Sequence, residues 1–271
     1  MSKSLLALTL TLLLLTATMR AQNPPAPQGG RGGRGGPPGP PPTAQAQAPF
    51  DLTGYWVSVV TEDWRWRMLT PQKGDYASVP LNAEGTRVAN TWDLEKDKAE
   101  GNICRVFGAA GLLRLPLRIH ITWQDANTLK LETDAGQQTR LLMFGEPSAT
   151  PGERTWQGRS LARWYKQPQL EGLGFGGRGG GVAGGNLRVT TTNMKAGYLR
   201  KNGVPYSEDA VLTEYFNRHD EPNGDQWITV TRLVDDPKYL TMPFVTSESF
   251  KKEPNASKWH PAPCDVEPPR K

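Results

Sequence analysis

The sequence predicts an all-β protein in which an antiparallel meander closes into a barrel of about 8–10 strands, with one short helix and a glycine-rich loop. Three observations predict this fold class. Alternating or β-rich segments recur between turn signals from residue 50 onward. The connections between these segments are short, which favours antiparallel neighbours. Only one stretch has a helical pattern, which argues against an α/β arrangement.

Residues 1–21 are predicted to be a secretory signal peptide. Lys3 supplies a positive start, Leu5–Leu15 is an apolar run, and Ala21 is a small residue for cleavage. The run is too short to cross a bilayer comfortably; an uncleaved membrane anchor is the alternative. We therefore expect export to a periplasm or beyond, without stable membrane insertion after the signal is cleaved.

Residues 22–48 are predicted to be a disordered linker, because they hold 8 Pro and 7 Gly and no large apolar residue to bury. Contact of its two Gly-Gly-Arg units with RNA or an acidic cell-surface polymer is the alternative role. Residues 49–271 are expected to form a single β-barrel domain.

The charge of the folded part argues against a nucleic-acid partner. The formal net charge of +5 falls to +3 without residues 1–21, which hold two basic residues and no acid. It falls to +1 without residues 22–48, which also hold two basic residues and no acid. Phosphate recognition needs a concentrated basic surface, which a nearly neutral domain does not offer.

The elements of the barrel are expected in the following order. Strands are predicted at residues 53–60, 64–69, 117–123, 128–134, 138–144, 155–165, 187–194, 210–219, 227–234 and 242–250. The helix is predicted over residues 83–99, because Asn82 can cap it and Val88 and Trp92 lie four apart on one face.

Residues 172–185, with 9 Gly, are expected as a loop between two strands, or as a lid over a pocket mouth. Gly172, Gly174 and Gly177 match the spacing of the dinucleotide-binding fingerprint. That motif requires a strand before it and a helix after it, and no helix is expected here. We expect no cofactor.

The hairpin at residues 117–134 permits a prediction of register, because a slip of one residue turns every side chain to the other face. A three-residue loop at 125–127 sets Trp123 opposite Leu129 on the apolar face. The same register sets His120 opposite Glu132 on the other face.

The following hairpin extends this polar face. Placing Leu131 opposite Leu141 sets Glu132 opposite Arg140, so that one face carries the row His120–Glu132–Arg140. Glu132 would then stay ionised and favour protonated His120. Such a row can orient an acid–base histidine. The alternative is a set of surface pairs that stabilise the sheet by roughly 0.2–1 kcal/mol each.

Tryptophans on two segments are candidates for a ligand-binding wall. In segment 64–69, Trp64 and Trp66 share one face and Arg65 and Arg67 share the other. This strand offers an aromatic wall for an apolar ligand or an arginine pair for a carboxylate. An ordinary half-buried strand is the alternative.

A second candidate wall contains Trp156 and Trp164, which share a face with the small residues Gly158, Ser160 and Ala162. The small residues leave room beside the indole rings, or let another element pack closely.

Cys104 and Cys264 are the only cysteines, and in an oxidising compartment we expect them to form a disulfide. Two free thiols are the alternative, because the sequence does not show whether their Cα atoms approach. His120, His219 and His260 are scattered without ligand spacing, so no metal site is expected.

The segment 51–56, Asp-Leu-Thr-Gly-Tyr-Trp, resembles the Gly-x-Trp signature of lipocalin-like (calycin) barrels. The resemblance implies a lipocalin-like barrel in which this motif opens the first strand and Trp56 plugs one end, with Gly54 and Trp56 structural. Residues 197–206 and 236–240 resemble stretches of exported bacterial proteins of unassigned function, which implies no activity.

Three functions fit these features. The first is an exported binding protein that holds an amphipathic or hydrophobic small molecule in a cavity lined by the tryptophans, with the arginines of residues 64–67 as polar anchors. The second is a cofactor-free enzyme (a lyase, isomerase or hydrolase) that uses His120 and Glu132 as an acid–base pair beside Arg140. The third is a structural or surface-interaction protein without a cavity.

Overall fold

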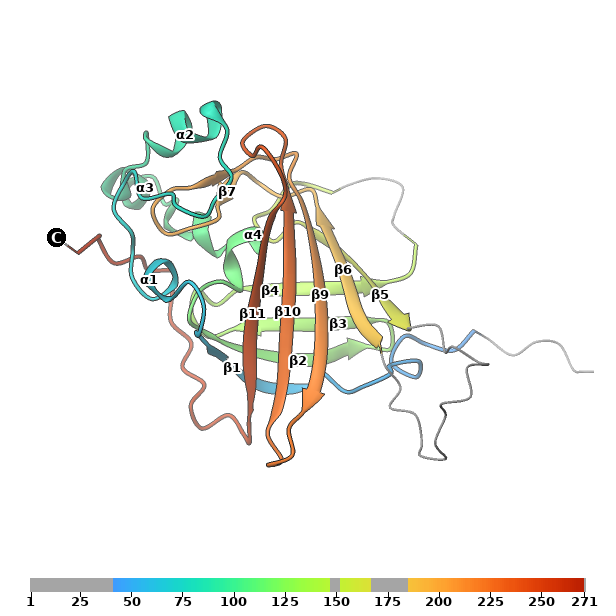
Figure 1. Cartoon of the computed structure of the whole chain (residues 1–271). Coiled ribbons are helices and arrows are strands. Elements are labelled where there is room, and N and C mark those ends of the chain that lie inside the picture. Colours follow the sequence, from blue (N-terminus) through green and yellow to red (C-terminus); the bar gives the residue numbers. More distant parts are fainter. Residues whose placement is uncertain (1–40, 147–151, 167–184, 271) are drawn as a thin grey trace, which may run out of the picture. The chain divides into compact units, whose positions relative to one another are not determined.

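Nine strands close into a barrel in the computed structural model, which describes residues 41–146, 152–166 and 185–270 (Figure 1). Around the barrel the strands are β1 (Gly54–Val59), β11 (Phe244–Glu253), β10 (Gln226–Asp235), β9 (Val211–Asp220), β6 (Gly185–Thr192), β5 (Arg159–Lys166), β4 (Thr139–Phe144), β3 (Thr128–Thr133) and β2 (Arg118–Asp125). Strand β2 pairs with β1 and completes the circle. The predicted all-β barrel is confirmed. The predicted signal peptide and the glycine-rich segment up to residue 184 lie outside the described residues.

One pair of neighbouring strands departs from the predicted antiparallel meander. Strands β4 and β5 are parallel, with Leu142 opposite Ser160. Every other pair in the barrel is antiparallel. The connection between β4 and β5 therefore has to return from one end of the barrel to the other.

A set of short elements covers one end of the barrel, at the upper left of Figure 1. We call this set the cap; it consists of α1 (Trp64–Arg67), α2 (Ala83–Ala89), α3 (Leu94–Ala99), the 3-10 helix η1 (Ile103–Phe107), α4 (Ala109–Leu112), β7 (Gly197–Tyr198) and β8 (Pro205–Tyr206). In residues 41–146, 152–166 and 185–270, no helix is long and apolar enough to span a membrane.

Two elements predicted from the sequence differ in the cap. The single helix predicted over residues 83–99 is two helices, because Asp93 has an extended backbone and its side chain accepts a hydrogen bond from the Lys96 amide, which starts a new helix. The strand predicted at 64–69 is the one-turn helix α1. Asp63 before it adopts a left-handed conformation (φ 52°), which turns the chain out of the extended path.

The barrel interior has three levels along β9, β10 and β11. At one level the inward side chains are Phe216, Ile228, Val230 and Phe250, in a core that also holds Trp56. At the next level they are Glu214, Arg232 and Glu248, all buried. At the third level they are Leu212, Val234 and Phe244, in a second core shared with the cap. A layer of buried charge thus separates two apolar cores.

Within the charged layer, ion pairs join strands to each other and hydrogen bonds join them to α4. Arg140 on β4 donates through both terminal nitrogens to Glu214, at 3.1 and 2.6 Å. Arg232 lies 3.4 Å from the same carboxylate and donates to the carbonyl oxygens of Ala109 and Ala110 at 2.9 and 2.8 Å. A buried charge is tolerated when it is paired and hydrogen-bonded in this way.

A second group of arginines attaches α1. Arg114 bridges Glu248 at 3.2 Å and Asp63 at 2.9 Å. Arg67, at the end of α1, donates to the carbonyl oxygen of Arg114 at 2.9 Å and pairs with Glu62. The predicted role of Arg67 as an anchor in a ligand cavity therefore gives way to a role in holding the cap on the barrel.

The predicted register of the first hairpin is confirmed: Trp123 lies opposite Leu129, and His120 opposite Glu132. The predicted register of the second hairpin is wrong by one residue. Glu132 faces Thr139, and Arg140 faces Leu131 on the inside of the barrel.

The slip in the second hairpin has a physical reason. Leu142 is 1% exposed and Leu141 is 38% exposed, so Leu142 is the residue that fills the core. The observed register turns Arg140 inward, where Glu214 neutralises it. The local sequence of the hairpin does not reveal this distant partner.

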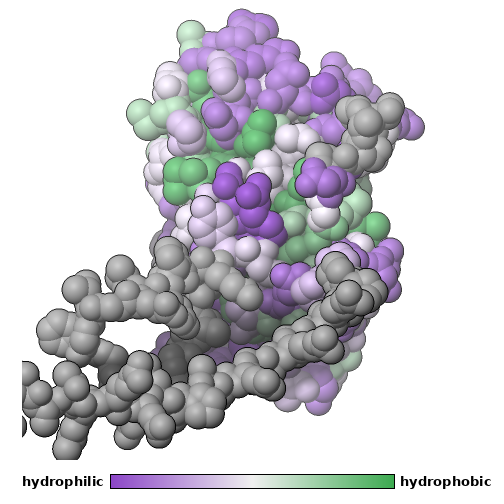
Figure 2. Space-filling model, turned by 90° about the vertical axis from the view of Figure 1, so that its right-hand side faces the viewer, coloured by the Kyte–Doolittle hydropathy of each residue, from purple (hydrophilic) through white to green (hydrophobic). Residues whose placement is uncertain are grey.

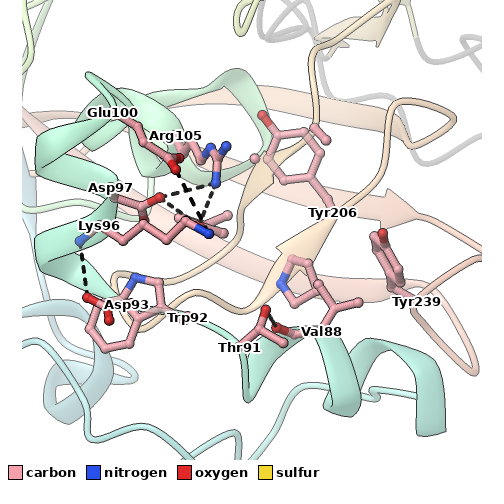
Figure 3. Close-up of a pocket in the computed structure, with 14 residues that line it drawn as sticks. Val88, Thr91, Trp92, Asp93, Lys96, Asp97, Glu100, Arg105, Tyr206 and Tyr239 are labelled. Carbon is pink, nitrogen blue, oxygen red and sulfur yellow. Dashed lines mark hydrogen bonds and ion pairs between the residues drawn. The ribbon is translucent and has the colours of Figure 1, made fainter.

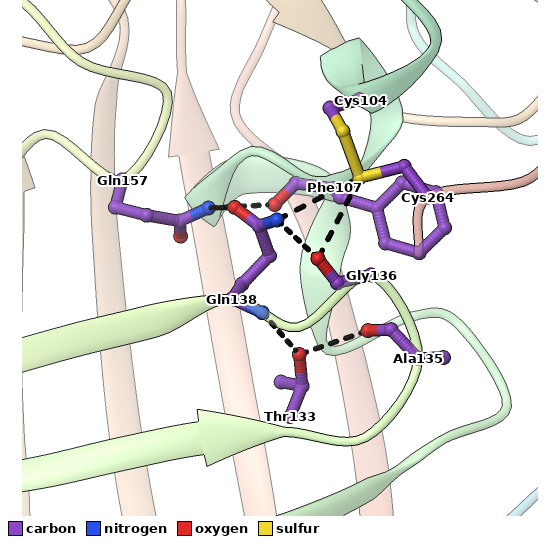
Figure 4. The surroundings of a disulfide bond; sticks show 8 residues. All are labelled: Cys104, Phe107, Thr133, Ala135, Gly136, Gln138, Gln157 and Cys264. Carbon is purple, nitrogen blue, oxygen red and sulfur yellow. Dashed lines mark hydrogen bonds between the residues drawn. A yellow bond between two sulfur atoms is a disulfide. The ribbon is translucent and has the colours of Figure 1, made fainter. Parts of the chain in front are cut away.

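Cys104 and Cys264 form the predicted disulfide, with a Cα–Cα distance of 5.3 Å (Figure 4). The bridge joins η1 to the C-terminal tail. Ala262 in this tail hydrogen-bonds on both sides to the β3–β4 turn, through Asp134 and Gly136. Gly136 has φ 78°, and a Cβ there would lie 2.2 Å from the ring of Phe107 on η1. The turn, the tail and η1 therefore form one packed unit.

The end of the barrel opposite the cap is closed by the segment before β1. Ala44 is buried; its amide donates to Asn127 and its carbonyl accepts from the indole N–H of Trp164, both at 2.8 Å. The last residues of the predicted linker thus pack on the barrel.

The face turned to the viewer in Figure 2 has hydrophobic side chains in separate areas among hydrophilic ones, and its upper end is mainly hydrophilic.

Candidate functional site

A cleft of about 300 Å³ lies between α2, α3, η1 and the β7–β8 hairpin (Figure 3). We call it the cap cleft. Its lining combines aromatic and charged side chains: Val88, Thr91, Trp92, Asp93, Lys96, Asp97, Glu100, Arg105, Tyr198, Tyr206 and Tyr239. Pockets that combine apolar walls with a few convergent polar groups are the usual form of small-molecule sites.

Helix α3 supplies most of the charges of the cap cleft. Asp93 caps its N-terminus, and Lys96, Asp97 and Glu100 follow at three- and four-residue spacing, which places all four side chains on the face toward the cleft. Just past the end of the helix, the Asn102 amide donates to the carbonyl oxygen of Asp97 at 2.7 Å, directly before η1.

Three side chains in this cleft form a closed hydrogen-bonded cluster. Nη1 of Arg105 donates to Oδ1 of Asp97 at 3.1 Å and to the hydroxyl of Tyr198 at 3.0 Å. The Tyr198 hydroxyl donates to the same Asp97 oxygen at 3.2 Å. The side chain of Asp97 is 7% exposed and that of Arg105 is 34% exposed, so the carboxylate lies beneath and the guanidinium faces the cleft.

Burial raises the pKa values of two groups in this cluster, Tyr198 and Asp97. It raises the pKa of Tyr198 to about 12, so the hydroxyl remains a donor at neutral pH. Burial also raises the pKa of Asp97, while the hydrogen bond from Tyr198 and the charge of Arg105 oppose the rise. The cluster therefore presents a fixed arrangement of donors around one carboxylate.

Tyr206 also lines the cap cleft, and its side chain is completely buried. In the part of the chain that the structure describes, its hydroxyl has no hydrogen-bond partner. A Cβ at Gly108 or Gly197 would lie 2.2 or 2.6 Å from this hydroxyl oxygen, so both positions require glycine. Burial raises the pKa of Tyr206.

A second hollow of about 600 Å³, which we call the side groove, lies beside the cap cleft. Its lining is Asn102, Arg105, Glu153, Arg154, Trp156, Lys195, Ala196 and Glu208. Arg105 and Ala196 line both hollows. The two hollows are therefore adjacent and meet at Arg105.

The structure does not bring the four predicted tryptophans together around one cavity. Trp64 is 62% exposed on α1. Trp66 donates through its indole N–H to Asp75 at 3.1 Å, and the exposed Arg65 pairs with the same carboxylate at 2.7 Å. Residues 64–67 are accordingly a surface turn of the cap and not a wall of the barrel interior.

The other two tryptophans lie at opposite ends of β5, Trp156 before its first residue and Trp164 near its last. Trp156 lines the side groove next to the cap. Trp164 packs at the opposite end, against Phe144 with ring centroids 5.2 Å apart and against Phe50 at 5.5 Å. Only Trp156 among the predicted aromatic residues lies at the candidate site.

The predicted row His120–Glu132–Arg140 is also divided. His120 and Glu132 are paired on the outer face, with Nδ1 3.5 Å from the carboxylate. The imidazole stacks on Tyr55 at 4.0 Å between ring centroids, with the edge of Trp259 at 6.0 Å. Arg140 lies inside the barrel, so the row predicted for an enzyme does not form.

Glu132 raises the pKa of His120, as predicted, but the net shift is downward, so the predicted protonated state is wrong. Burial lowers the pKa of His120 and outweighs the attraction of Glu132. The imidazole is therefore held mainly neutral at pH 7, as expected for a ring stacked beneath a second aromatic side chain.

Within the described ranges of the chain, no three His, Cys, Asp or Glu side chains gather as they do around a metal ion. No model of a known protein family, no curated protein and no solved structure matches the chain. The closed barrel is compatible with the lipocalin-like resemblance, and Trp56 is completely buried in the barrel core.

The cluster of Asp97, Arg105 and Tyr198 is absent from the sequence predictions. Tyr198 is 93 residues from Arg105, and the three members belong to three short elements without a recognisable motif. One signal was available: Arg105 directly follows Cys104, so the disulfide fixes the position of the arginine.

Proposed function

We propose that this chain is an exported small-molecule binding protein that takes its ligand in the cap cleft. The observation that carries the proposal is the hydrogen-bonded cluster of Asp97, Arg105 and Tyr198 in the wall of a cleft that also holds aromatic side chains. Polar groups fixed in advance by their neighbours recognise a ligand at low entropic cost. This location replaces the predicted tryptophan-lined cavity inside the barrel.

The position of the barrel charges supports a site on the cap. Arg140, Glu214 and Arg232 occupy the centre of the barrel interior, where both arginines pair with Glu214 and Arg232 also donates to α4. A hydrophobic ligand at this level would separate buried ion pairs, which is costly. A ligand bound in the cap cleft would leave these buried ion pairs intact.

Export is supported by two independent features. The N-terminal residues have the order of a signal peptide, with Lys3 before the apolar run Leu5–Leu15. The disulfide between Cys104 and Cys264 belongs to an oxidising compartment. Expression of the full chain followed by fractionation and N-terminal sequencing tests this part: we expect an extracytoplasmic product that starts after Ala21, and an intact cytoplasmic chain would contradict it.

Ligand binding can be tested with the purified exported form. Native mass spectrometry reports a retained ligand, and isothermal titration with sugars, amino acids, fatty acids and amines reports affinity. We expect Tyr198→Phe and Arg105→Gln to weaken binding by tenfold or more. Arg65→Gln, an exposed cap arginine paired with Asp75, serves as the matched control and should bind as the native chain does.

The outcomes of this experiment are distinct. Binding that weakens in both cluster variants and not in the control supports the cap cleft as the site. Binding that is equal in all four proteins, or the lack of any bound molecule from the panel and from a cell extract, would overturn the proposal.

A further inference from the structure

The cap cleft and the side groove form one path that crosses Arg105. Nη1 of this side chain is engaged with Asp97 and Tyr198. Within residues 41–146, 152–166 and 185–270, its Nε and Nη2 make no hydrogen bond. A guanidinium carries five N–H donors, so Arg105 keeps donors for a molecule that passes from one hollow to the other. Two adjacent hollows of about 300 and 600 Å³ fit an elongated ligand better than a compact one.

Hydrogen-bond donors and acceptors are mixed along this path. In the cap cleft, Glu100 accepts and the remaining N–H groups of Arg105 donate; in the side groove, Lys195 donates and Asn102 does both. A sugar hydroxyl both donates and accepts, so it can pair with every one of these groups. A phosphate or carboxylate cannot donate to the acids, and an ammonium cannot accept from the cations.

The charges on the two sides point to a neutral ligand. The cap cleft has three carboxylates (Asp93, Asp97 and Glu100) and two cations (Lys96 and Arg105). In the side groove, three basic side chains lie with two acidic ones. Neither hollow has the single-sign charge that selects an ion.

Aromatic rings lie on both sides of Arg105. Tyr198 and Tyr239 are half-buried in the cap cleft, and Trp156 is half-buried in the side groove. The C–H face of a pyranose ring is apolar and buries area against such a ring while its hydroxyl groups remain at the edge. The tyrosine rings in the cap cleft and the Trp156 ring in the side groove provide a position for one sugar unit in each hollow.

We infer that the ligand is a neutral oligosaccharide, with one unit in the cap cleft, a linkage over Arg105 and a further unit on Trp156 in the side groove. This inference rests on the proposed function, since it names the ligand class of that site and extends it by a second position.

A length series tests the inference. Cello-, malto- and chito-oligosaccharides from monomer to hexamer are titrated into the exported form by calorimetry. In one of these series, we expect the affinity of the native chain to rise by tenfold or more from monomer to trimer. Trp156→Ala should remove this gain, because it deletes the ring of the second position. Lys195→Ala, in the same groove, gives a second test if the tryptophan variant does not fold.

Trp64→Ala is the control, because Trp64 is exposed on α1 and lies in neither hollow; it should keep the full gain with length. Circular dichroism and thermal unfolding confirm the fold of each variant. An affinity that does not depend on length, or a gain that survives both groove variants, would overturn the inference and leave the proposed function intact. Binding of another ligand class that depends on Tyr198 and Arg105 would also overturn the oligosaccharide inference and leave the proposed function intact. Loss of the proposed function requires instead that no ligand responds to the cluster variants.

Discussion

At the scale of single residues, the buried pair of Arg140 and Glu214 decides how the barrel is filled. Both side chains are completely buried, and the pair holds β4 against β9 across the interior. Removal of one partner leaves the other charge buried without compensation, which is far more costly than loss of a surface pair.

We expect Glu214→Gln to lower the free energy of unfolding by about 3–5 kcal/mol, because Arg140 would keep a buried, unpaired charge. Urea unfolding at neutral pH measures the change. Glu84→Gln is the matched control, since Glu84 pairs with Arg87 on the exposed surface of α2, and it should change stability little. Equal effects of the two substitutions would show that the buried pair has no special role.

His120 gives a pH-dependent expectation at the same scale. Its pKa in the folded protein lies below the ordinary value of 6.5, chiefly because of burial. Below pH 6.5 the unfolded chain therefore binds more protons at this position than the folded chain does. The stabilising contribution of neutral His120 is complete above the unfolded pKa and is lost as pH falls through the folded pKa.

We accordingly expect the native chain to lose more stability than His120→Gln between about pH 7.5 and pH 5. Urea midpoints of the two proteins across this range provide the measurement. A parallel loss in both proteins, or an NMR titration of His120 with a midpoint above 6.5, would contradict the assignment.

At the scale of elements, the β3–β4 hairpin shows what a local pattern can and cannot predict. In β2 and β3, apolar and polar residues alternate, so one register alone keeps Trp123 and Leu129 on the inner face. In β4, Leu141 and Leu142 are adjacent, so either of them could be the apolar residue that faces the core. The local sequence alone does not distinguish these two registers. The choice depends on Glu214, which is distant in the sequence and neutralises Arg140.

The same limit applies to the cap. The alternation of Trp64, Arg65, Trp66 and Arg67 is compatible with a strand, but Asp63 turns the chain and the arginine contacts of α1 hold the helical turn. The cluster at the cap cleft was not predicted, because three short elements without motifs bring it together, and only the neighbouring Cys104 marks the position of Arg105.

The observed register of β4 has a direct test. We expect Leu142→Ala to reduce the free energy of unfolding by about 2–5 kcal/mol, since it leaves a cavity in the barrel core. Leu141→Ala should change it by about 0.5 kcal/mol or less, because this side chain faces outward. Urea denaturation distinguishes the two, and the reverse order of effects would support the register in which Leu141 faces Leu131.

At the scale of the whole molecule, the disulfide connects the C-terminal tail to the cap across 160 residues of sequence. A cross-link of this length restricts the unfolded chain and stabilises the fold by roughly 5 kcal/mol at most in the loop-entropy model. It also fixes η1, which carries Arg105.

We therefore expect a reducing agent to lower the urea midpoint of the native chain, and to have no effect on a Cys104→Ser/Cys264→Ser variant, which should already unfold at the lower midpoint. Comparison of both proteins with and without reductant is the measurement. A native chain whose midpoint is the same in both conditions would show that the bridge contributes no stability.

The pairing of β1 with both β2 and β11 has a consequence for the order of folding. Tyr55 lies opposite Glu253, so the seam of the barrel joins the first strand to the last one. During synthesis, β1 lacks one of its two neighbours until β11 has been made. The barrel therefore stays open at this seam while the strands between β1 and β11 are being made, and these two strands complete it together.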